Sequence, residues 1–219
     1  MVRTSKPSLV FLLAVLLATA AVAQKIKVIV DQDARGPGTS DQQAILVFLQ
    51  SDKFDVLAIT TVSGDQWVKE ETRHVLRLEE IAGRTDVPVI QGAEFPLLNS
   101  KEESERWEAL YGKLEYKGCW TERFEAQRST IYEEPYHPPD VVPPMPEGEP
   151  DIHALPGTAA EFIVKMVHKY PGEVVLWAGG PLTNYALALK LDPSVATLAK
   201  ELVMMGGGLY ADKGGAIPD

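Results

Sequence analysis

Residues 25–49 read KIKVIVDQDARGPGTSDQQAILVFL, and this stretch decides the fold. Its first residues alternate between polar and apolar and then become continuously apolar up to Val30, which is typical of a buried central strand in a parallel sheet. The Gly, Pro, Thr and Ser residues that follow cannot continue a strand, so a loop is expected. Ser40 or Asp41 should then cap a helix that begins near Gln42.

Three carboxylates stand at the end of this strand and in the loop after it, namely Asp31, Asp33 and Asp41. In open α/β sheets, ligands bind at the edge formed by the carboxyl ends of the strands. Carboxylates held close together repel one another, so the arrangement requires either raised pKa values or a cation between them. Oxygen ligands without Cys or His favour Ca²⁺ or Mg²⁺ over zinc. The alternative is an ordinary loop that binds nothing.

The same alternation of strands and helices continues along the chain. Strands are expected at 54–61, 87–90, 173–177 and 202–205, and helices at 67–82, 104–114, 158–168 and 182–190. Short connections between such elements indicate parallel strands joined by right-handed crossovers. The sequence therefore predicts an α/β domain over residues 24–219, with an open, mostly parallel, Rossmann-like sheet and helices on both faces.

A long segment, about residues 98–156, interrupts this pattern and is crowded with proline and acidic residues in its second half. Long irregular segments inside a compact domain are usually functional or mobile. Two interpretations stay open at this point: a flap over the active site, or an insertion that packs on the surface.

Residues 1–23 are predicted to be a secretory signal peptide. Arg3 and Lys6 give a positive start, residues 9–22 form an apolar run, and residues 21–23 read Ala-Val-Ala, a small-x-small cleavage site. The apolar run is short for a membrane span, although an uncleaved N-terminal anchor is the alternative. We therefore expect an exported protein, periplasmic or extracellular, that begins at Gln24 and has no stable membrane span after cleavage.

Composition limits the other classes of function. The single cysteine, Cys119, excludes an internal disulfide, so stability must come from a packed core. The formal net charge of -10 argues against binding to nucleic-acid backbones, which requires clustered Lys and Arg. A small-molecule ligand at the acidic strand end fits this composition better.

Five segments lie at strand ends or in the turns that follow them: VDQDARGPGTSDQQAIL, DVLAITTVSGD, DVPVIQGAEFPL, GGPLTNYALALKLDP and ELVMMGGG. In this order they resemble the inosine-uridine nucleoside hydrolases, which are Ca²⁺-dependent N-ribohydrolases. The resemblance implies hydrolysis of the N-glycosidic bond of purine or pyrimidine ribonucleosides by a Ca²⁺-activated water, giving ribose and free base. It implies a nucleoside or related ribosyl substrate as partner, and it leaves a homo-oligomer open.

The resemblance also implies roles for four residues around the metal. Asp33 matches the aspartate that binds the metal and acts as general base, and Asp41 matches the second metal carboxylate. Asp31 matches the first aspartate of the motif, which either binds the cation directly or supports a ligand that does. Gly179 matches the position whose backbone carbonyl binds the metal.

Three further positions match the sugar pocket of the family. Ser40 stands where an aspartate that binds ribose hydroxyls is usual, Asp65 stands where an asparagine is usual, and Met205 matches a residue that lines the pocket. The loop between Asp33 and Asp41 is also longer than in the family. These departures concern the substrate more than the metal.

The chain ends at Asp219, before the family's later sugar and leaving-group residues. It resembles the N-terminal two-thirds of the family's domain, so we expect an incomplete domain whose C-terminal part is missing and a chain that is inactive, or far less active than the family, when made alone. Two other functions remain open. One is an exported, non-catalytic ribose- or nucleoside-binding module. The other is a haloacid-dehalogenase-like phosphohydrolase, in which Arg35 would replace the usual Thr or Val and the GGPLTN segment would have no role.

Overall fold

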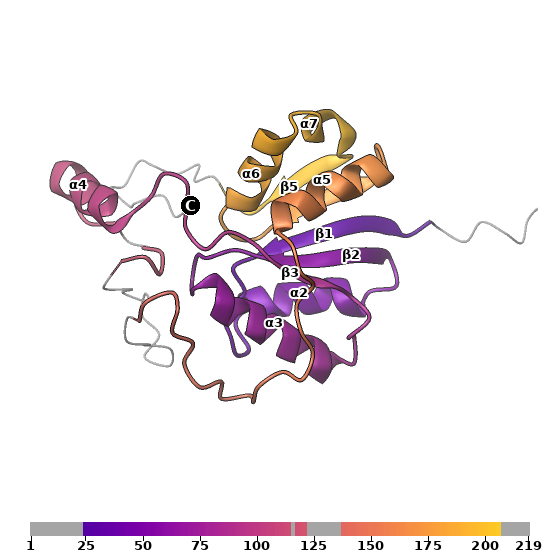
Figure 1. The fold of residues 1–219 in the computed structure, drawn as a ribbon, viewed down its shortest axis with the longest axis horizontal. Helices are drawn as coiled ribbons and strands as arrows, with labels where there is room; N and C mark the ends of the chain where they lie inside the picture. Colours follow the sequence, from indigo (N-terminus) through magenta and orange to yellow (C-terminus); the bar gives the residue numbers. More distant parts are fainter. Residues whose placement is uncertain (1–23, 115–116, 122–136, 207–219) are drawn as a thin grey trace, which may run out of the picture.

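The structure, a computed structural model, describes residues 24–114, 117–121 and 137–206 (Figure 1). These residues contain a five-stranded sheet with the order β3-β2-β1-β4-β5, and every adjacent pair is parallel. The strands are β1 (Ile26–Gln32), β2 (Phe54–Thr61), β3 (Val89–Gln91), β4 (Val174–Ala178) and β5 (Glu201–Met204). The predicted parallel α/β fold is confirmed.

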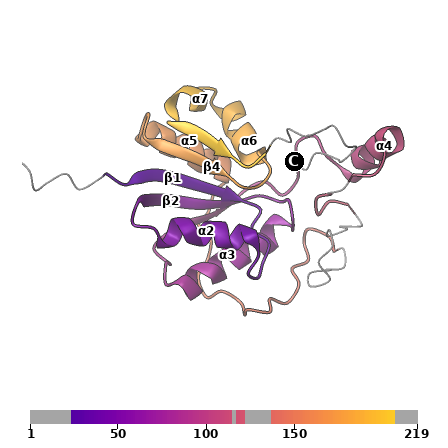
Figure 2. The same ribbon diagram turned by 180° about the vertical axis from the view of Figure 1, so that it is seen from behind.

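Helices cover both faces of the sheet, as the two views show (Figures 1 and 2). On one face lie α2 (Ser40–Gln50) and α3 (Val68–Ala82). On the other lie α5 (Ala159–Lys169), α6 (Thr183–Leu191) and the short α7 (Val195–Leu198). A further helix, α4 (Lys101–Tyr111), stands away from the sheet and buries none of its residues.

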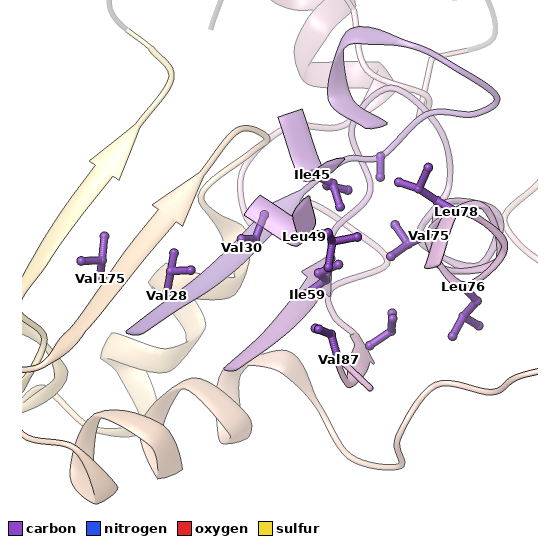
Figure 3. Packing of buried hydrophobic residues seen from close by; sticks show 12 residues of the cluster. Val28, Val30, Ile45, Leu49, Ile59, Val75, Leu76, Leu78, Val87 and Val175 are labelled. Atoms are coloured by element: carbon purple, nitrogen blue, oxygen red, sulfur yellow. The ribbon is translucent and has the colours of Figure 1, made fainter. Parts of the chain in front are cut away.

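The central strand β1 is buried on both sides because its side chains alternate between two cores. Val28 and Val30 pack with Ile45, Leu49 and other residues beneath α2 and α3 (Figure 3). Ile29 points the opposite way, into the core beneath α5 and α6. Burial on both faces explains the continuous apolar run in the sequence, and it brings Asp31 and Asp33 to the carboxyl edge.

Some element boundaries differ from the predictions. The N-cap of α2 is Thr39, not Ser40 or Asp41, and no side chain forms a cap hydrogen bond there. The Thr39 hydroxyl instead donates to the carbonyl of Arg35 and so closes the loop. Helix α4 begins and ends three residues earlier than expected, because Ser100 accepts a hydrogen bond from the Glu103 N–H and caps it. Helix α7 was not predicted.

Part of the long insertion lies along α3, and we call this part, residues 137–156, the strap. The guanidinium of Arg77 donates to the Glu147 carbonyl (2.9 Å), and the Asp151 N–H donates to the Glu80 carboxylate (2.6 Å). At its end the Leu155 N–H donates to the carbonyl of Val89 (2.8 Å) in β3. The strap therefore fits the interpretation of an insertion that packs on the surface.

The predicted signal peptide, residues 1–23, lies outside the described residues. Among the residues that are described, no helix combines the length and the apolar character needed to cross a membrane.

Candidate functional site

A cavity of about 1120 Å³ opens at the carboxyl edge of the sheet. Five residues predicted for the site line it, namely Asp33, Ser40, Asp41, Asp65 and Met205. They come from the ends of β1, β2 and β5 and from the first turn of α2. Parallel strands that end at one edge thus bring together residues up to 172 positions apart in the chain.

Asp33 lies at the end of β1 between two glycines that leave room for its side chain. A β-carbon built on Gly64, after β2, would lie 2.2 Å from its Oδ2 atom, and one built on Gly180, after β4, would lie 2.6 Å from its Oδ1 atom. The Asp65 N–H donates to Asp33 Oδ2 (3.2 Å). A larger residue at either glycine would displace the carboxylate, so both turns fix its position.

The acidic groups affect one another strongly. Burial raises the pKa of Asp33 well above its ordinary value, and the charges of Asp65 and Asp41 raise it further. Burial and Asp65 raise the pKa of Asp41 to about 6, although hydrogen bonding from Thr39 and the charge of Arg35 oppose this. The charged forms of these carboxylates are therefore disfavoured when no cation is present, and a bound cation would stabilise them.

Asp31 lies beneath the cavity and is fully buried. Its Oδ2 atom accepts hydrogen bonds from the Thr60 hydroxyl and from the Asn184 amide (2.7 Å). Burial raises the pKa of Asp31 to about 7, against the effect of these two hydrogen bonds. Of the two predicted roles, supporting other site residues agrees better with this position than direct contact with a ligand.

Asn184 is a site residue that our sequence analysis missed. Besides Asp31, its amide reaches the carbonyl of Thr61 at the end of β2 (2.9 Å), and its Oδ1 atom accepts the Ala93 N–H after β3 (2.9 Å). One side chain from α6 thus connects three strand ends. The polar pair Thr183 and Asn184, directly after the turn that follows β4, was the available signal.

Gly179 follows β4 and donates its N–H to the Asp31 carbonyl (2.9 Å), which continues the pairing of the two strands. Its neighbour Gly180, rather than Gly179, lines the cavity. The role of the Gly179 carbonyl as a metal ligand stays a prediction.

The side chains at the site supply some of the oxygen ligands that a cation such as Ca²⁺ requires. Among the described residues, no three or more Asp, Glu, His or Cys side chains converge closely enough to hold a metal ion. Asp33 and Asp41 nevertheless offer two carboxylates with mutual repulsion beside one cavity. Ca²⁺ takes six to eight oxygen ligands, so carbonyls, waters or substrate hydroxyls would have to supply the remainder.

The opposite wall of the cavity is apolar and comes from the insertion. Trp107, Leu110 and Tyr111 of α4 line it, together with Trp120 and Leu98. This part of the insertion agrees with the interpretation of a flap over the active site. The strap agrees with the interpretation of an insertion that packs on the surface. An acidic floor facing aromatic side chains suits a ligand with a polar part and a planar apolar part. These aromatic residues were also missed: a helix was expected at 104–114, but its sequence does not indicate which part of the molecule it faces.

Fold and site together define an α/β protein with an acidic small-molecule cavity at the carboxyl edge of its sheet. The profile of the inosine-uridine preferring nucleoside hydrolase family matches residues 28–216, and the chain belongs to that family. Uridine nucleosidase 1 of Arabidopsis thaliana is 35% identical over 185 residues, which is 84% of this chain and 46% of the relative.

Two further comparisons agree. The inosine-uridine preferring nucleoside hydrolase of Crithidia fasciculata is 29% identical over 84% of this chain and 49% of its own length. A solved plant nucleoside hydrolase superposes with a TM-score of 0.58 and 28% identity, over 84% of this chain and 49% of the other. The chain therefore spans about half the length of the relatives it matches.

Proposed function

We propose that this protein hydrolyses the N-glycosidic bond of ribonucleosides, releasing ribose and a free base, with a divalent cation, Ca²⁺, at Asp33 and Asp41. The observation that carries the proposal is the position of Asp33, held between Gly64 and Gly180 beside Asp41 and Asp65 in one cavity. Family membership supports the reaction class.

Cleavage of an N-glycosidic bond passes through a state in which positive charge develops on the sugar. The carboxylates of Asp41 and Asp65 would stabilise that charge, since both line the cavity. Asp33, which lines the cavity, is placed to accept a proton from the attacking water. A bound Ca²⁺ would orient this water and lower its pKa. The apolar wall formed by α4 would face the base and exclude bulk water.

Release of uracil from uridine and of hypoxanthine from inosine, followed by chromatography, tests the proposal. We expect release that requires Ca²⁺, stops with a chelator and is lost in Asp33→Asn. Asp52→Asn, which changes an exposed carboxylate at the opposite end of the sheet, is the matched control and should behave like the wild type. Release of base neither by this chain nor by a version extended with the C-terminal part of the family's domain would contradict the reaction.

A non-catalytic ribose- or nucleoside-binding module is the second candidate, and Ser40 favours it. Ser40 lines the cavity where the family resemblance leads us to expect an aspartate for the ribose hydroxyls. Calorimetry with ribose, uridine and inosine in the presence of Ca²⁺ separates the two: binding of ligand without release of base would support the module. Family membership gives the phosphohydrolase alternative no support.

We also propose that the protein is exported, since residues 1–23 combine a positive start, an apolar run and an Ala-Val-Ala site. Mass spectrometry of the protein recovered from its native compartment should give Gln24 as the first residue. A cytoplasmic product that retains Met1 would contradict this.

A further inference from the structure

The acidic loop, residues 33–41, is hydrogen-bonded to a buried residue outside it, Gln66. We propose that Gln66 is a positioning residue, which holds this acidic loop against the acidic turn, residues 64–67, and thereby sets the affinity of the site for its cation. The inference rests on the proposed function, because it assumes that Asp33 and Asp41 bind a divalent ion. It concerns a residue that lines no part of the cavity and that the family resemblance assigns no role.

Both polar atoms of the Gln66 side-chain amide form hydrogen bonds. Its Oε1 atom accepts the Gly36 N–H (3.2 Å), which lies midway between the two proposed metal ligands in the acidic loop. Its Nε2 atom donates to Glu70 Oε1 (2.9 Å) on α3. Gln66 is 4% exposed and Glu70 is 2% exposed, so water does not compete effectively for these hydrogen bonds. The amide thus connects the loop to a buried carboxylate.

The backbone of Gln66 is fixed as well. Its N–H donates to Glu71 Oε1 (2.9 Å), and its carbonyl accepts from the Gly64 N–H (3.1 Å) and from the buried thiol of Cys119 (3.2 Å). The preceding residue, Asp65, donates its N–H to Asp33. A displacement of Gln66 would therefore move both Asp65 and the loop that carries Asp33.

The loop also approaches α3 too closely for a side chain at Gly36. A β-carbon built there would lie 2.2 Å from His74 Nδ1 and 2.8 Å from the Gln42 amide nitrogen. The Gln66 amide connects the loop to Glu70 across this close contact. Leucine has a similar volume but offers neither hydrogen bond, and asparagine is one methylene too short to keep both.

Calorimetric titration with Ca²⁺ tests the inference. Supporting residues around a metal site typically contribute 10- to 100-fold in affinity, so we expect Gln66→Leu and Gln66→Asn to bind Ca²⁺ about tenfold or more weakly. Gln43→Leu is the matched control, because the Gln43 amide also contacts this loop, at the Gly38 carbonyl (3.2 Å), but from an exposed position. It should retain wild-type affinity.

A second readout separates positioning from general stability. Hydrogen exchange of residues 33–40 without cation should accelerate in the Gln66 variants and not in Gln43→Leu, while thermal unfolding reports global stability. If Gln66→Leu does not fold, Gln66→Asn decides. Ca²⁺ affinity within about twofold of wild type in the folded variants would overturn the inference. Absence of Ca²⁺ binding by the wild type would overturn it together with the cation of the proposed function. Ca²⁺ binding that weakens in the variants, without release of base, would support it and contradict only the reaction.

Discussion

Asp33 shows how a residue of the candidate site can be costly to the fold. The side chain is buried beside Asp41 and Asp65, and its pKa in the folded chain lies well above the ordinary value of 3.8. An acid whose pKa is raised on folding contributes stability only while it is protonated, and this contribution is lost as the pH rises above the unfolded value. At neutral pH the cation-free site therefore destabilises the protein.

Asp33→Asn should accordingly have opposite effects with and without Ca²⁺. Without the cation, we expect the melting temperature at pH 7.5 to rise, because a neutral amide removes the repulsion; each kcal/mol corresponds to about 2–4 °C in a chain of this size. With Ca²⁺, the variant should lose most of the stabilisation that the wild type gains. Thermal unfolding with Ca²⁺ and with chelator measures both, and a variant that is less stable without cation would contradict the argument.

At this scale the sequence located the residues that face the cavity and missed those that support them. Asp33, Asp41 and Asp65 were predictable because each follows a strand or stands in a helix's first turn. Asn184 and Gln66 were not, because their partners lie across the fold: Asn184 reaches Asp31 and Ala93, and Gln66 reaches Gly36. Hydrogen bonds between distant segments leave no periodic pattern in the sequence.

At the scale of elements, α3 supports the candidate site and contains several buried acidic residues. Glu70, Glu71 and Glu79 are all buried in this one helix. Glu71 and Glu70 hold the acidic turn, so their burial is explained by contacts with Gln66. Glu79 lies at the other end, and within the described structure neither of its carboxylate oxygens has a hydrogen-bond partner.

Glu79→Gln should stabilise the protein at alkaline pH. Burial and the nearby Asp86 raise the pKa of Glu79 to about 8, although Arg84 opposes this. Its contribution to stability is therefore present below pH 4.5, the ordinary pKa, and is lost as the pH rises towards 8. We expect the melting temperature of Glu79→Gln to exceed that of wild type by a few degrees at pH 8.5, and the difference to shrink at pH 5. Glu105→Gln, an exposed change, is the control; a difference independent of pH would contradict the assignment.

The contact between the strap and α3 should also weaken as the pH rises. Burial alone would lower the pKa of His74, but hydrogen bonds to Glu70 and Glu147 outweigh it and raise the pKa above 6.5. The contact between His74 and the strap is therefore strongest below pH 6.5 and weakens as the pH rises through the folded pKa. Hydrogen exchange at residues 145–152, corrected for its intrinsic pH dependence, should accelerate above neutrality.

Glu147→Gln should make exchange in the strap faster at pH 6 and less dependent on pH, because it removes one of the two carboxylates that face His74. His168→Gln is the control, since His168 pairs with Asp192 far from the strap. If Glu147→Gln leaves the pH profile of the strap unchanged, another group controls it.

Periodicity predicted the regular elements well, because β1, β2, α3 and α5 each bury one or two continuous apolar faces. Periodicity failed where an apolar residue is not buried or where local hydrogen bonds set the ends of an element. Ile81, for example, is an apolar residue of α3, yet it is 62% exposed. The insertion is rich in proline only in its second half, which includes the strap, but composition alone does not show which part packs on α3 and which lines the cavity.

At the scale of the whole molecule, burial differs sharply between the centre of the sheet and its β5 edge. The central strand β1 is buried over most of its length, whereas every residue of β5 is exposed, including Leu202, Val203 and Met204. In the described residues β5 is an edge strand that pairs only with β4. An exposed apolar edge strand is a template for pairing with another chain.

We therefore expect the isolated 219-residue polypeptide to self-associate through β5, and Val203→Lys to weaken this association. Val203 is central in β5, 43% exposed and opposite Trp177 of β4, so a lysine there places a charge at the edge without removing a core residue. Sedimentation velocity over a range of concentrations should show association about tenfold weaker, which corresponds to about 1.4 kcal/mol. Val47→Lys, at an exposed apolar position on α2, is the matched control and should associate like the wild type. A wild-type chain that stays monomeric at high concentration would contradict the prediction, and equal effects of the two variants would mean that general hydrophobicity, not the β5 edge, drives association.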